Sequence, residues 1–461
     1  MSTLSPLDRL MPRGYVRQMF CFPSTHADVS HILKTSLAGV VADVPYLLSE
    51  IIISDDHRHI SLSKPYQSLK DLFSEQDISN AVDYATLKQQ HFPPSAFTVP
   101  GIIPPDTQPP FPNPAPVFRA RLALVNRGFI LCVAVHHCTT DITGFGALLK
   151  IWASYSRTSA STIGFGPDWL DRKALLEQFH ASDQRAPASI PELLHVQENI
   201  VKPIGSSFHS PNWTTGIFFF PQKTLQSLKQ AINQYIASQD AEGWVSLGDI
   251  LTVLLWSAIL VAESDPNTDI KGTSTIGFPV NFRSRLNPPL SPNYLGSAFV
   301  MAVATCLRED LIFAKNASLP SGDMTLDSAS ISALAKIATT IRTSLHQVDG
   351  ERVRDVLLYL DAAPDNHPPI TLGPPHDGIS IVSWADQGAY ELDWGSIIGK
   401  CDAIRLPKLM NKRYPIVLPR VPATADGDGG LEVIVCFDRP VWERFRQSWP
   451  ICQFATLRCY S

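Results

Sequence analysis

Two adjacent histidines and a nearby aspartate offer the most reactive combination of side chains in this chain. His136 and His137 follow the apolar run from Phe129 to Val135, and Asp141 stands four residues after His137. Imidazole titrates near neutral pH, so a histidine that faces a substrate hydroxyl can accept its proton, a task worth roughly 10²–10⁴ in rate. The pattern therefore indicates general base chemistry by a histidine, with the Asp141 carboxylate orienting the groups around it.

Two other interpretations of the histidine pair stay open from the residues alone. Buried histidines are often satisfied by backbone carbonyls and take part in no chemistry. Two histidines and an aspartate can also bind a metal ion, but no further His or Cys cluster stands nearby at ligand spacing, so we expect no metal. Cys138 has no separate base at the spacing of known thiol hydrolases, so we do not expect it to be the nucleophile.

A β-hairpin is expected to position these side chains. Apolar residues alternate with others from Phe118 to Leu124, the turn Asn126-Arg127-Gly128 follows, and Phe129 to Val135 is apolar throughout. These patterns predict two antiparallel strands, the second of which is buried on both faces. Because neighbouring side chains of a strand point to opposite faces, we expect His136 to be a core histidine and His137 to face the substrate.

Length and composition place the chain among soluble globular proteins. It has 461 residues, of which 44% are hydrophobic and 18% charged, and this length favours two domains. The net charge is −5 and no basic cluster is interleaved with aromatic residues, so we expect no nucleic-acid partner. The first ten residues do not resemble a signal peptide, and no stretch approaches about 20 apolar residues. We therefore expect a cytoplasmic protein that does not insert in membranes.

The eight cysteines lack CxxC spacing, and several lie in apolar runs where a thiol is a small core residue. The proline-rich stretch from His91 to Pro116 predicts an extended surface loop.

We place a domain boundary near residue 205, with residues 1–205 carrying the histidines, a crossover from about residue 156, and residues 206–461 forming a second domain. Further helices are expected at Val29–Val41, Tyr66–Phe73, Phe145–Tyr155 and, after a capping-box-like Ser246 and Asp249, Leu247–Glu263; further strands are expected within Glu50–Ser63 and at Ser274–Val280, Ala298–Cys306, Ile379–Trp384 and Leu431–Phe437.

Several motifs in order along the chain carry a family resemblance. His137-Cys138-Thr139-Thr140-Asp141 matches an HxxxD motif, and Leu392-Asp393-Trp394-Gly395 is similar to a shortened DFGWG motif. Between them lies an Arg283-containing segment, Val280–Leu286, followed by Asn293–Gly296. With these motifs the chain resembles the BAHD-type acyltransferases, and within them the fungal branch that includes the trichothecene acetyltransferases. The resemblance runs nearly end to end and extends to Leu4–Pro12 and Asp171-Arg172.

Two positions depart from the family pattern. Ile142 stands where a glycine usually follows the motif aspartate, with Gly144 and Gly146 further on, and Ser297 stands where asparagine is common. Neither change removes a reacting group, although each can reshape the loop or the acceptor pocket. The enzyme interpretation is therefore kept.

The resemblance implies an α/β fold with mixed sheets, in which two domains of the chloramphenicol-acetyltransferase-like fold enclose a tunnel with His137 at its centre. It implies acyl-CoA, here acetyl-CoA, as a co-substrate rather than a bound cofactor, and a small-molecule alcohol, or less readily an amine, as acceptor. His137 would be the base for direct attack on the thioester, without an acyl-enzyme. Asp141 would turn away from the substrate and pair with Arg283, which fixes the loop. A monomer is the family expectation.

The resemblance assigns the other motif residues to supporting roles. Asp393, Trp394 and Gly395 are expected to be structural, as a turn with a packed tryptophan remote from the base. Ser383 lies in a segment that lines the tunnel in similar proteins, so it is a candidate for steadying the oxyanion. Thr140 is a second candidate for the pocket.

The sequence thus predicts an acyl-CoA-dependent O-acyltransferase that acetylates a hydroxyl of a fungal secondary metabolite such as a terpenoid or polyketide. Two alternatives remain. A condensation-domain-like protein would take its acyl group from a carrier-protein thioester. A repurposed family member would bind or convert a natural product without acyl transfer.

Overall fold

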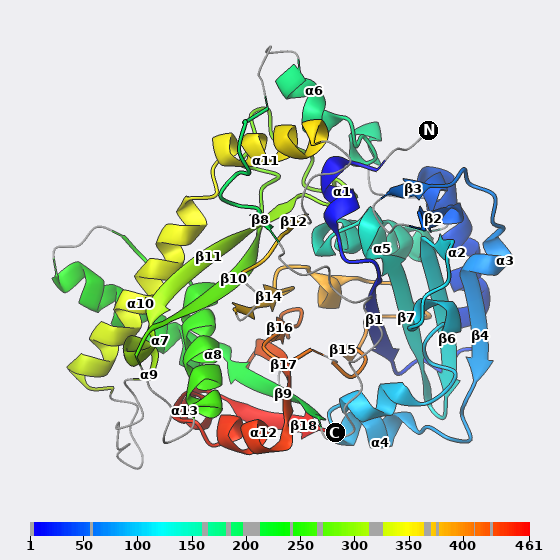
Figure 1. Ribbon diagram of the computed structural model, residues 1–461. Helices are drawn as coiled ribbons and strands as arrows, with labels where there is room; N and C mark the ends of the chain where they lie inside the picture. The colour runs from blue at the N-terminus through cyan, green and yellow to red at the C-terminus, as the bar shows by residue number, and fades with distance from the viewer. Residues whose placement is uncertain are drawn as a thin grey trace.

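The structure, a computed structural model, describes residues 4–55, 59–158, 165–180, 186–196, 213–239, 243–264, 271–312, 326–363, 370–374, 378–409, 411–424 and 427–461. The described residues form two five-stranded sheets, two three-stranded sheets and one two-stranded sheet, with helices packed around them (Figure 1). The predicted α/β class with mixed sheets is confirmed. The boundary predicted near residue 205 lies outside the described residues.

The first sheet contains the predicted hairpin. Its strands β6 (Phe118–Val125) and β7 (Gly128–His136) pair antiparallel, and every residue of β7 is buried, as expected. Strand β1 (Tyr15–Phe22), which the sequence analysis did not predict, pairs with the other edge of β7 and places Tyr15 opposite His136. The sheet order is β15-β1-β7-β6-β4, with β4 (Phe73–Asp77) parallel to β6 and β15 (Ala403–Arg405) contributed from late in the chain.

Both faces of this sheet are covered, which explains the apolar run that ends at the histidines. Phe20 and Leu131 belong to a core shared with helices α2 (Val29–Asp43) and α5 (Ile142–Thr158). Met19 and Ile130, one position along, belong to a separate core with α4 (Tyr84–Gln89) and the short helix η2 (Pro94–Thr98). Burying each large apolar side chain contributes about 1.5–3 kcal/mol, so the strand that delivers His137 is firmly fixed.

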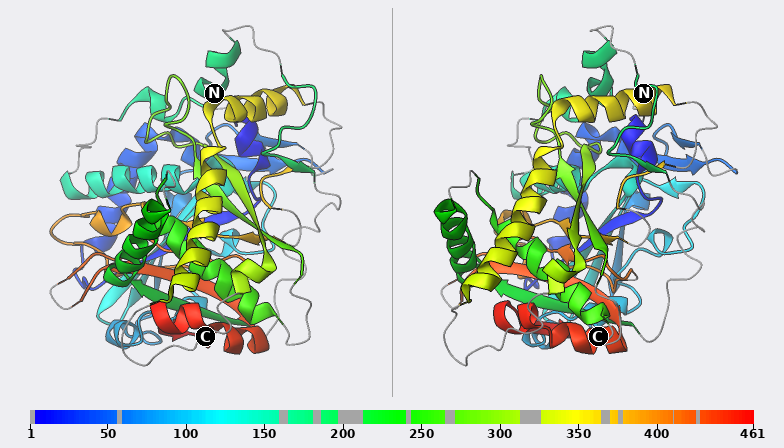
Figure 2. Two further views of the ribbon diagram at one scale, coloured as in Figure 1. Left: turned by 90° about the vertical axis from the view of Figure 1, so that its left-hand side faces the viewer. Right: turned by 60° about the vertical axis from the view of Figure 1, so that its left-hand side comes forward.

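The second half of the described chain builds two more sheets. One has the order β14-β16-β17-β9-β18, with helices α7 and α12 packed on β9 and β17, and α8 and α13 packed beside α12. The other has the order β11-β10-β13, and helix α10 runs along β11 beside α7 (Figure 2). Their bounds are β14 Val382–Ser383, β16 Ile416–Val417, β17 Gly430–Asp438, β9 Trp213–Pro221, β18 Thr456–Tyr460, β11 Phe299–Leu307, β10 Thr273–Asn281, β13 Ile379–Ser380, α7 Gln222–Ser238, α8 Leu247–Glu263, α10 Ser328–His346, α12 Arg439–Arg446 and α13 Trp449–Phe454.

The remaining elements lie before or between these. They are α1 Pro6–Leu10, η1 Pro45–Leu48, β2 Glu50–Ile53, β3 Ile60–Leu62, α3 Leu69–Leu72, η3 Pro105–Thr107, β5 Ala115–Pro116, η4 His137–Thr139, η5 Pro167–Trp169, α6 Ala174–His180, β8 His195–Val196, α9 Arg308–Ile312, α11 Gly350–Ala362, β12 Ile370–Thr371 and η7 Ala389–Glu391. In the part of the chain that the structure describes, none of the helices combines the length and apolarity that crossing a membrane requires.

Three local predictions were wrong in detail. The proline-rich stretch 91–116 is not a loop throughout, because its prolines begin the short helices η2 and η3 and it ends in β5. The helix expected at Tyr66–Phe73 has only four residues and leads directly into β4. The single strand expected at 379–384 is split between two sheets. The Ile381 amide donates to the carbonyl of Gly277 in one sheet, whereas the Val382 amide donates to the carbonyl of Pro415, which leads into the other.

Candidate active site

The segment that carries His137 is fixed at the end of β7. His136 is the last residue of the strand, and its amide donates to the carbonyl of Val117 at 2.8 Å. The amide of His137 donates to the carbonyl of Gly14 at 2.7 Å, and His137 begins the single turn η4. The predicted position of the histidine pair at a strand end is confirmed.

The ring of His137 is suited to accept a proton. The residue is partly exposed, whereas its Nδ1 atom is buried and has no side-chain or backbone partner of hydrogen-bond geometry among the described residues. Burial lowers the pKa of His137 below that of an ordinary histidine, while backbone groups of His137 itself and of Thr140 and the Asp141 carboxylate act in the opposite direction. A lowered pKa keeps the imidazole neutral near pH 7, which is the form that a general base requires.

His136 and Cys138 have structural positions. His136 is 1% exposed, its Nδ1 accepts from the Cys138 amide at 3.3 Å, and its ring meets the ring of Tyr15 edge-on at 5.1 Å between centroids. Burial lowers the pKa of His136 to about 3, so it stays neutral. Burial raises the pKa of Cys138 to about 12, so it stays a thiol. The prediction that His136 is a satisfied core histidine is confirmed.

Asp141 makes the predicted contact with Arg283. The Nη1 and Nη2 atoms of Arg283 donate to the two carboxylate oxygens of Asp141 at 2.8 and 2.9 Å, and both side chains are at most 5% exposed. The same carboxylate accepts from the Gly144 amide at 2.8 Å, in the first turn of α5, and from the Ala298 amide at 2.9 Å. These contacts tie the Asp141 carboxylate to the first turn of α5 and to the residue that precedes β11.

Arg283 extends this contact to the segment before β11. Its Nη2 also donates to the carbonyls of Tyr294 and Gly296, each at 2.9 Å. Gly144 lies against the same segment, because an added Cβ would stand 2.4 Å from the carbonyl oxygen of Leu295. The close approach that requires glycine is thus at residue 144, which explains how Ile142 can occupy the position directly after the motif aspartate.

The Asp393-Trp394-Gly395 motif holds the far end of α5. Trp394 is 1% exposed and packs edge-on against Trp152 of α5 with 5.6 Å between ring centroids. The Ser156 hydroxyl, also on α5, donates to the Trp394 carbonyl at 3.1 Å. Asp393 accepts from the Gly395 amide at 3.0 Å, which closes a turn in which Gly395 has a φ of 96°. These contacts are structural in kind.

The two pocket candidates differ in what their hydroxyls do. Ser383 is exposed, and its Oγ accepts from the Ala385 amide at 3.4 Å, so its hydrogen is not used by that contact. The Thr140 hydroxyl is buried and donates to the carbonyl of Asp141 at 3.0 Å. Neither hydroxyl makes a hydrogen bond with the His137 side chain in the described part of the molecule, although the Thr140 amide donates to the His137 carbonyl at 3.4 Å.

A buried amide pair near α5 escaped the sequence analysis. Gln18 of β1 is 0% exposed and exchanges two hydrogen bonds with Gln387, at 2.8 and 3.0 Å. Gln387 packs on Gly146 of α5, since an added Cβ there would lie 3.1 Å from its Cγ. Gln18 stands next to Arg17 in the sequence, and its partner Gln387 lies far along the chain, so no local pattern identifies the pair.

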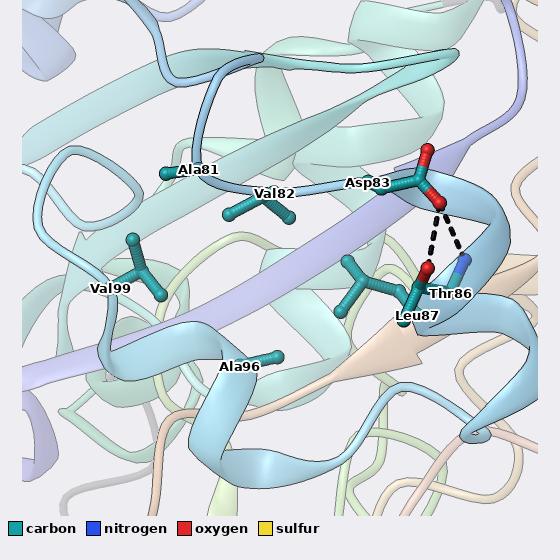
Figure 3. Close-up of a pocket in the computed structure, with 7 residues that line it drawn as sticks. All are labelled: Ala81, Val82, Asp83, Thr86, Leu87, Ala96 and Val99. Atoms are coloured by element: carbon teal, nitrogen blue, oxygen red, sulfur yellow. Dashed lines mark hydrogen bonds between the residues drawn. The ribbon is translucent and has the colours of Figure 1, made fainter.

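Two surface cavities lie elsewhere. One of about 390 Å³ is lined by Asp83, whose carboxylate accepts from the Thr86 amide and hydroxyl, and by six other residues (Figure 3). The other, of about 430 Å³, lies between Gln90 and strand β18. Neither contains a candidate residue. Across the described ranges, no three His, Cys, Asp or Glu side chains gather as metal ligands would.

The sequence matches two known protein families. The Transferase family matches residues 103–448, well over half of the chain, and the Trichothecene 3-O-acetyltransferase-like N-terminal domain matches residues 15–154. The chain belongs to the Transferase family. The BAHD-type acyltransferase family predicted from the sequence is thereby confirmed.

Similar members of the Transferase family come from fungi. The O-acetyltransferase ptmV of Penicillium ochrochloron is 24% identical over 473 residues, covering 91% of this chain and 90% of that protein. The O-acetyltransferase anaAT of Neosartorya fischeri is 26% identical over 432 residues, covering 82% and 81%. These relatives match along most of their own length.

The fold of this Transferase family protein also matches solved structures. The structure of F. sporotrichioides TRI101 complexed with Coenzyme A and T-2 has a TM-score of 0.77 at 20% identity and covers 99% of each chain. Vinorine Synthase has a TM-score of 0.60 at 17% identity and covers 96% of this chain and 91% of that one. The two comparisons establish the fold.

Proposed function

We propose that this protein is an acyl-CoA-dependent O-acyltransferase that acetylates a hydroxyl of a fungal secondary metabolite, of the terpenoid or polyketide class. Membership of the Transferase family supports acyl transfer as the reaction. The curated relatives are fungal O-acetyltransferases, and TRI101 was solved with Coenzyme A, which supports acetyl-CoA as a co-substrate rather than a bound cofactor. A small-molecule alcohol is the proposed acceptor.

His137 is the general base of the proposed reaction. Because its Nδ1 is buried and its ring is partly exposed, we assign Nε2 to the reacting proton. Nε2 accepts the hydroxyl proton as the acceptor oxygen attacks the thioester carbonyl carbon, and the tetrahedral oxyanion then collapses with cleavage of the carbon–sulfur bond. The thiolate leaves with the bonding electrons and takes the proton from the imidazolium. His137 is regenerated and no acyl-enzyme forms.

One observation carries this proposal: the buried bidentate pair of Asp141 and Arg283, four residues from His137. The carboxylate of Asp141 accepts two further backbone hydrogen bonds, so its oxygens are occupied and it does not compete as a base. Its role is to fix the start of α5 and with it the direction in which His137 leaves the strand. Positioning of this kind supplies a large part of the rate of acyl transfer.

The proposal also covers the supporting residues and the whole chain. Asp393, Trp394 and Gly395 are proposed to be structural, and Ser383 and Thr140 to border the pocket. Two domains, residues 1–205 and 206–461, are proposed to enclose a tunnel around His137. A cytoplasmic monomer is proposed, which light scattering and fluorescence tagging in a fungal host would check.

Thiol release from acetyl-CoA in the presence of a panel of fungal terpenoid and polyketide alcohols tests the function. We expect acceptor-dependent release by the unmodified protein and its loss in His137→Ala. His31→Ala, which changes an exposed histidine of α2, is the matched control and should retain the activity. Absence of release from any acyl-CoA would contradict the proposal and favour a carrier-protein thioester as donor, or a repurposed fold.

A further inference from the structure

We infer that a second buried ion pair, between Asp8 of α1 and Arg172, positions the segment that carries His137. The two side chains are 0% and 3% exposed, and Nη1 of Arg172 donates to the Asp8 carboxylate. Nη2 of Arg172 donates to the carbonyl of Thr139 at 2.7 Å, two residues after His137. The inference rests on the proposed function, because it assigns Asp8 and Arg172 as positioning residues for the base.

The two ion pairs are anchored to the same stretch of backbone. Asp8 accepts from the Ser297 amide at 3.0 Å, and Asp141 accepts from the next amide, that of Ala298, at 2.9 Å. Thr139, at the end of η4, is therefore tied through one pair to the residues that hold Asp141 through the other. With both sides of residue 140 fixed to one segment, the turn that follows His137 has little freedom to shift.

Helix α1 is built to present Asp8. The carboxylate of Asp8 accepts from the Ser5 amide at 2.9 Å while the Ser5 hydroxyl accepts from the Asp8 amide at 3.1 Å, which is a complete capping box. The chain then continues along the His137 segment. The Cys138 sulfur lies 3.6 Å from the Met11 carbonyl, and the Gly14 carbonyl accepts from the His137 amide.

Stability alone does not account for this pair. A buried ion pair can often be replaced by apolar residues with no loss of stability, because removing two charges from water is costly. What an apolar pair cannot replace is the directed hydrogen bond to the Thr139 carbonyl. The planar guanidinium serves Asp8 and Thr139 with separate nitrogens and lies over the ring of Tyr46, 5.1 Å from its centroid, so its orientation is fixed.

Arg172→Lys separates a positioning role from a purely structural one. Lysine keeps the positive charge beside Asp8, but its single nitrogen cannot reproduce both contacts of the guanidinium. The matched control is Arg405→Lys, because Arg405 is equally buried, pairs with Glu432, and also donates to backbone carbonyls, those of His91, Phe92 and Ile404. Those partners all lie outside the 137–141 segment.

The measurements are kcat and KM for acetyl-CoA by thiol release, melting temperature, and hydrogen–deuterium exchange of peptides that cover residues 137–141. We expect Arg172→Lys to lower kcat by about tenfold or more with KM within about twofold, and to speed exchange in those peptides, since misplacement of about 1 Å can cost about 10²-fold in rate. Arg405→Lys should lower the melting temperature comparably yet leave kcat and that exchange unchanged. Equal loss of kcat in both variants, or an unchanged kcat in Arg172→Lys, would overturn the inference.

Asp8→Asn is the second variant and covers the case in which Arg172→Lys does not fold. Asparagine keeps an oxygen for the Ser297 amide but leaves Arg172 without its counter-charge, so the same loss of kcat and the same faster exchange are expected. If the unmodified protein releases no thiol, the proposed function fails, and the exchange experiment alone decides the inference. Unchanged exchange at residues 137–141 in both variants would then refute it.

Discussion

The adjacent histidines His136 and His137 differ in burial and in proposed role because successive side chains of a strand point to opposite sides. His136 is 1% exposed, serves as an acceptor for the Cys138 amide and contacts the ring of Tyr15. His137 lies one position on, where the strand has ended, and retains partial exposure. The residue type is the same, so the difference in proposed role comes entirely from position.

The pH dependence of the reaction follows from the environment of His137. Burial lowers its pKa, so the neutral base persists below about pH 6.5, where an ordinary histidine would already be half protonated. We expect kcat/KM to stay level from about pH 8 down to about 6.5 and its acidic limb to have a midpoint below that value. Loss of thioester absorbance at constant ionic strength measures this profile. A midpoint above about 6.5 would mean that the ring is not desolvated in the working enzyme.

At the scale of elements, α5 is held at both ends by residues distant in sequence. Asp141, paired with Arg283, holds its first turn, while Trp394 packs on Trp152 and its carbonyl accepts from the Ser156 hydroxyl in the last turn. The two motifs of the family resemblance therefore act on opposite ends of one helix. This arrangement gives a physical reason why both occur in one chain although only the first carries the proposed base.

Replacing Arg283 should be costly at this element. Arg283→Ala leaves the Asp141 carboxylate buried without its counter-charge, which typically costs about 3–5 kcal/mol. We expect a drop of that size in the free energy of unfolding, measured by urea denaturation, together with loss of thiol release in the fraction that remains folded. Full activity and an unchanged unfolding curve would show that the pair does not hold the loop.

Gly395→Ala tests the other end of α5. Gly395 has a φ of 96°, and an added Cβ would lie 3.2 Å from the Cα atom of Arg157, so alanine would be strained there. We expect a loss of about 1–3 kcal/mol in thermal or urea unfolding. Gly248→Ala, in the first turn of α8 with space around it, is the control and should be neutral or slightly stabilising. Equal effects of the two substitutions would contradict the assignment of strain at Gly395.

The elements that the sequence predicted are those whose signals are local. The β6–β7 hairpin was predicted from alternation and its turn, and α8 from the capping-box-like spacing of Ser246 and Asp249, whose reciprocal hydrogen bonds the structure contains. Strand β14 was merged with β13 because the change of sheet at residue 381 depends on partners more than 30 residues away along the chain. The Asp141–Arg283 contact came from the family resemblance. The resemblance also covered Asp8 and Arg172, but their contact was not predicted, because no local pattern joins residues that far apart.

At the scale of the whole molecule, strand β15, which comes late in the chain, connects the two five-stranded sheets. Strand β15 adds to β1 in the first sheet, and Arg405 at its end forms a buried pair with Glu432 of β17 in the second, at 2.7 and 3.2 Å. Arg405 also donates to the carbonyls of His91 and Phe92. This charge pair therefore links the sheet that carries His137 to the sheet that contains β14 and Ser383.

Glu432→Gln tests whether this link sets stability or the geometry of the site. The substitution keeps the shape of the side chain but leaves the Arg405 charge uncompensated in the interior, so we expect a loss of about 3–5 kcal/mol in urea unfolding. Thiol release per folded molecule should stay within about twofold of the unmodified protein, because the loop of His137 is held by Asp141 and Arg283 and not by this pair. If activity instead falls about tenfold while the fold persists, the relative placement of the two sheets, and not the loop of His137 alone, controls the reaction.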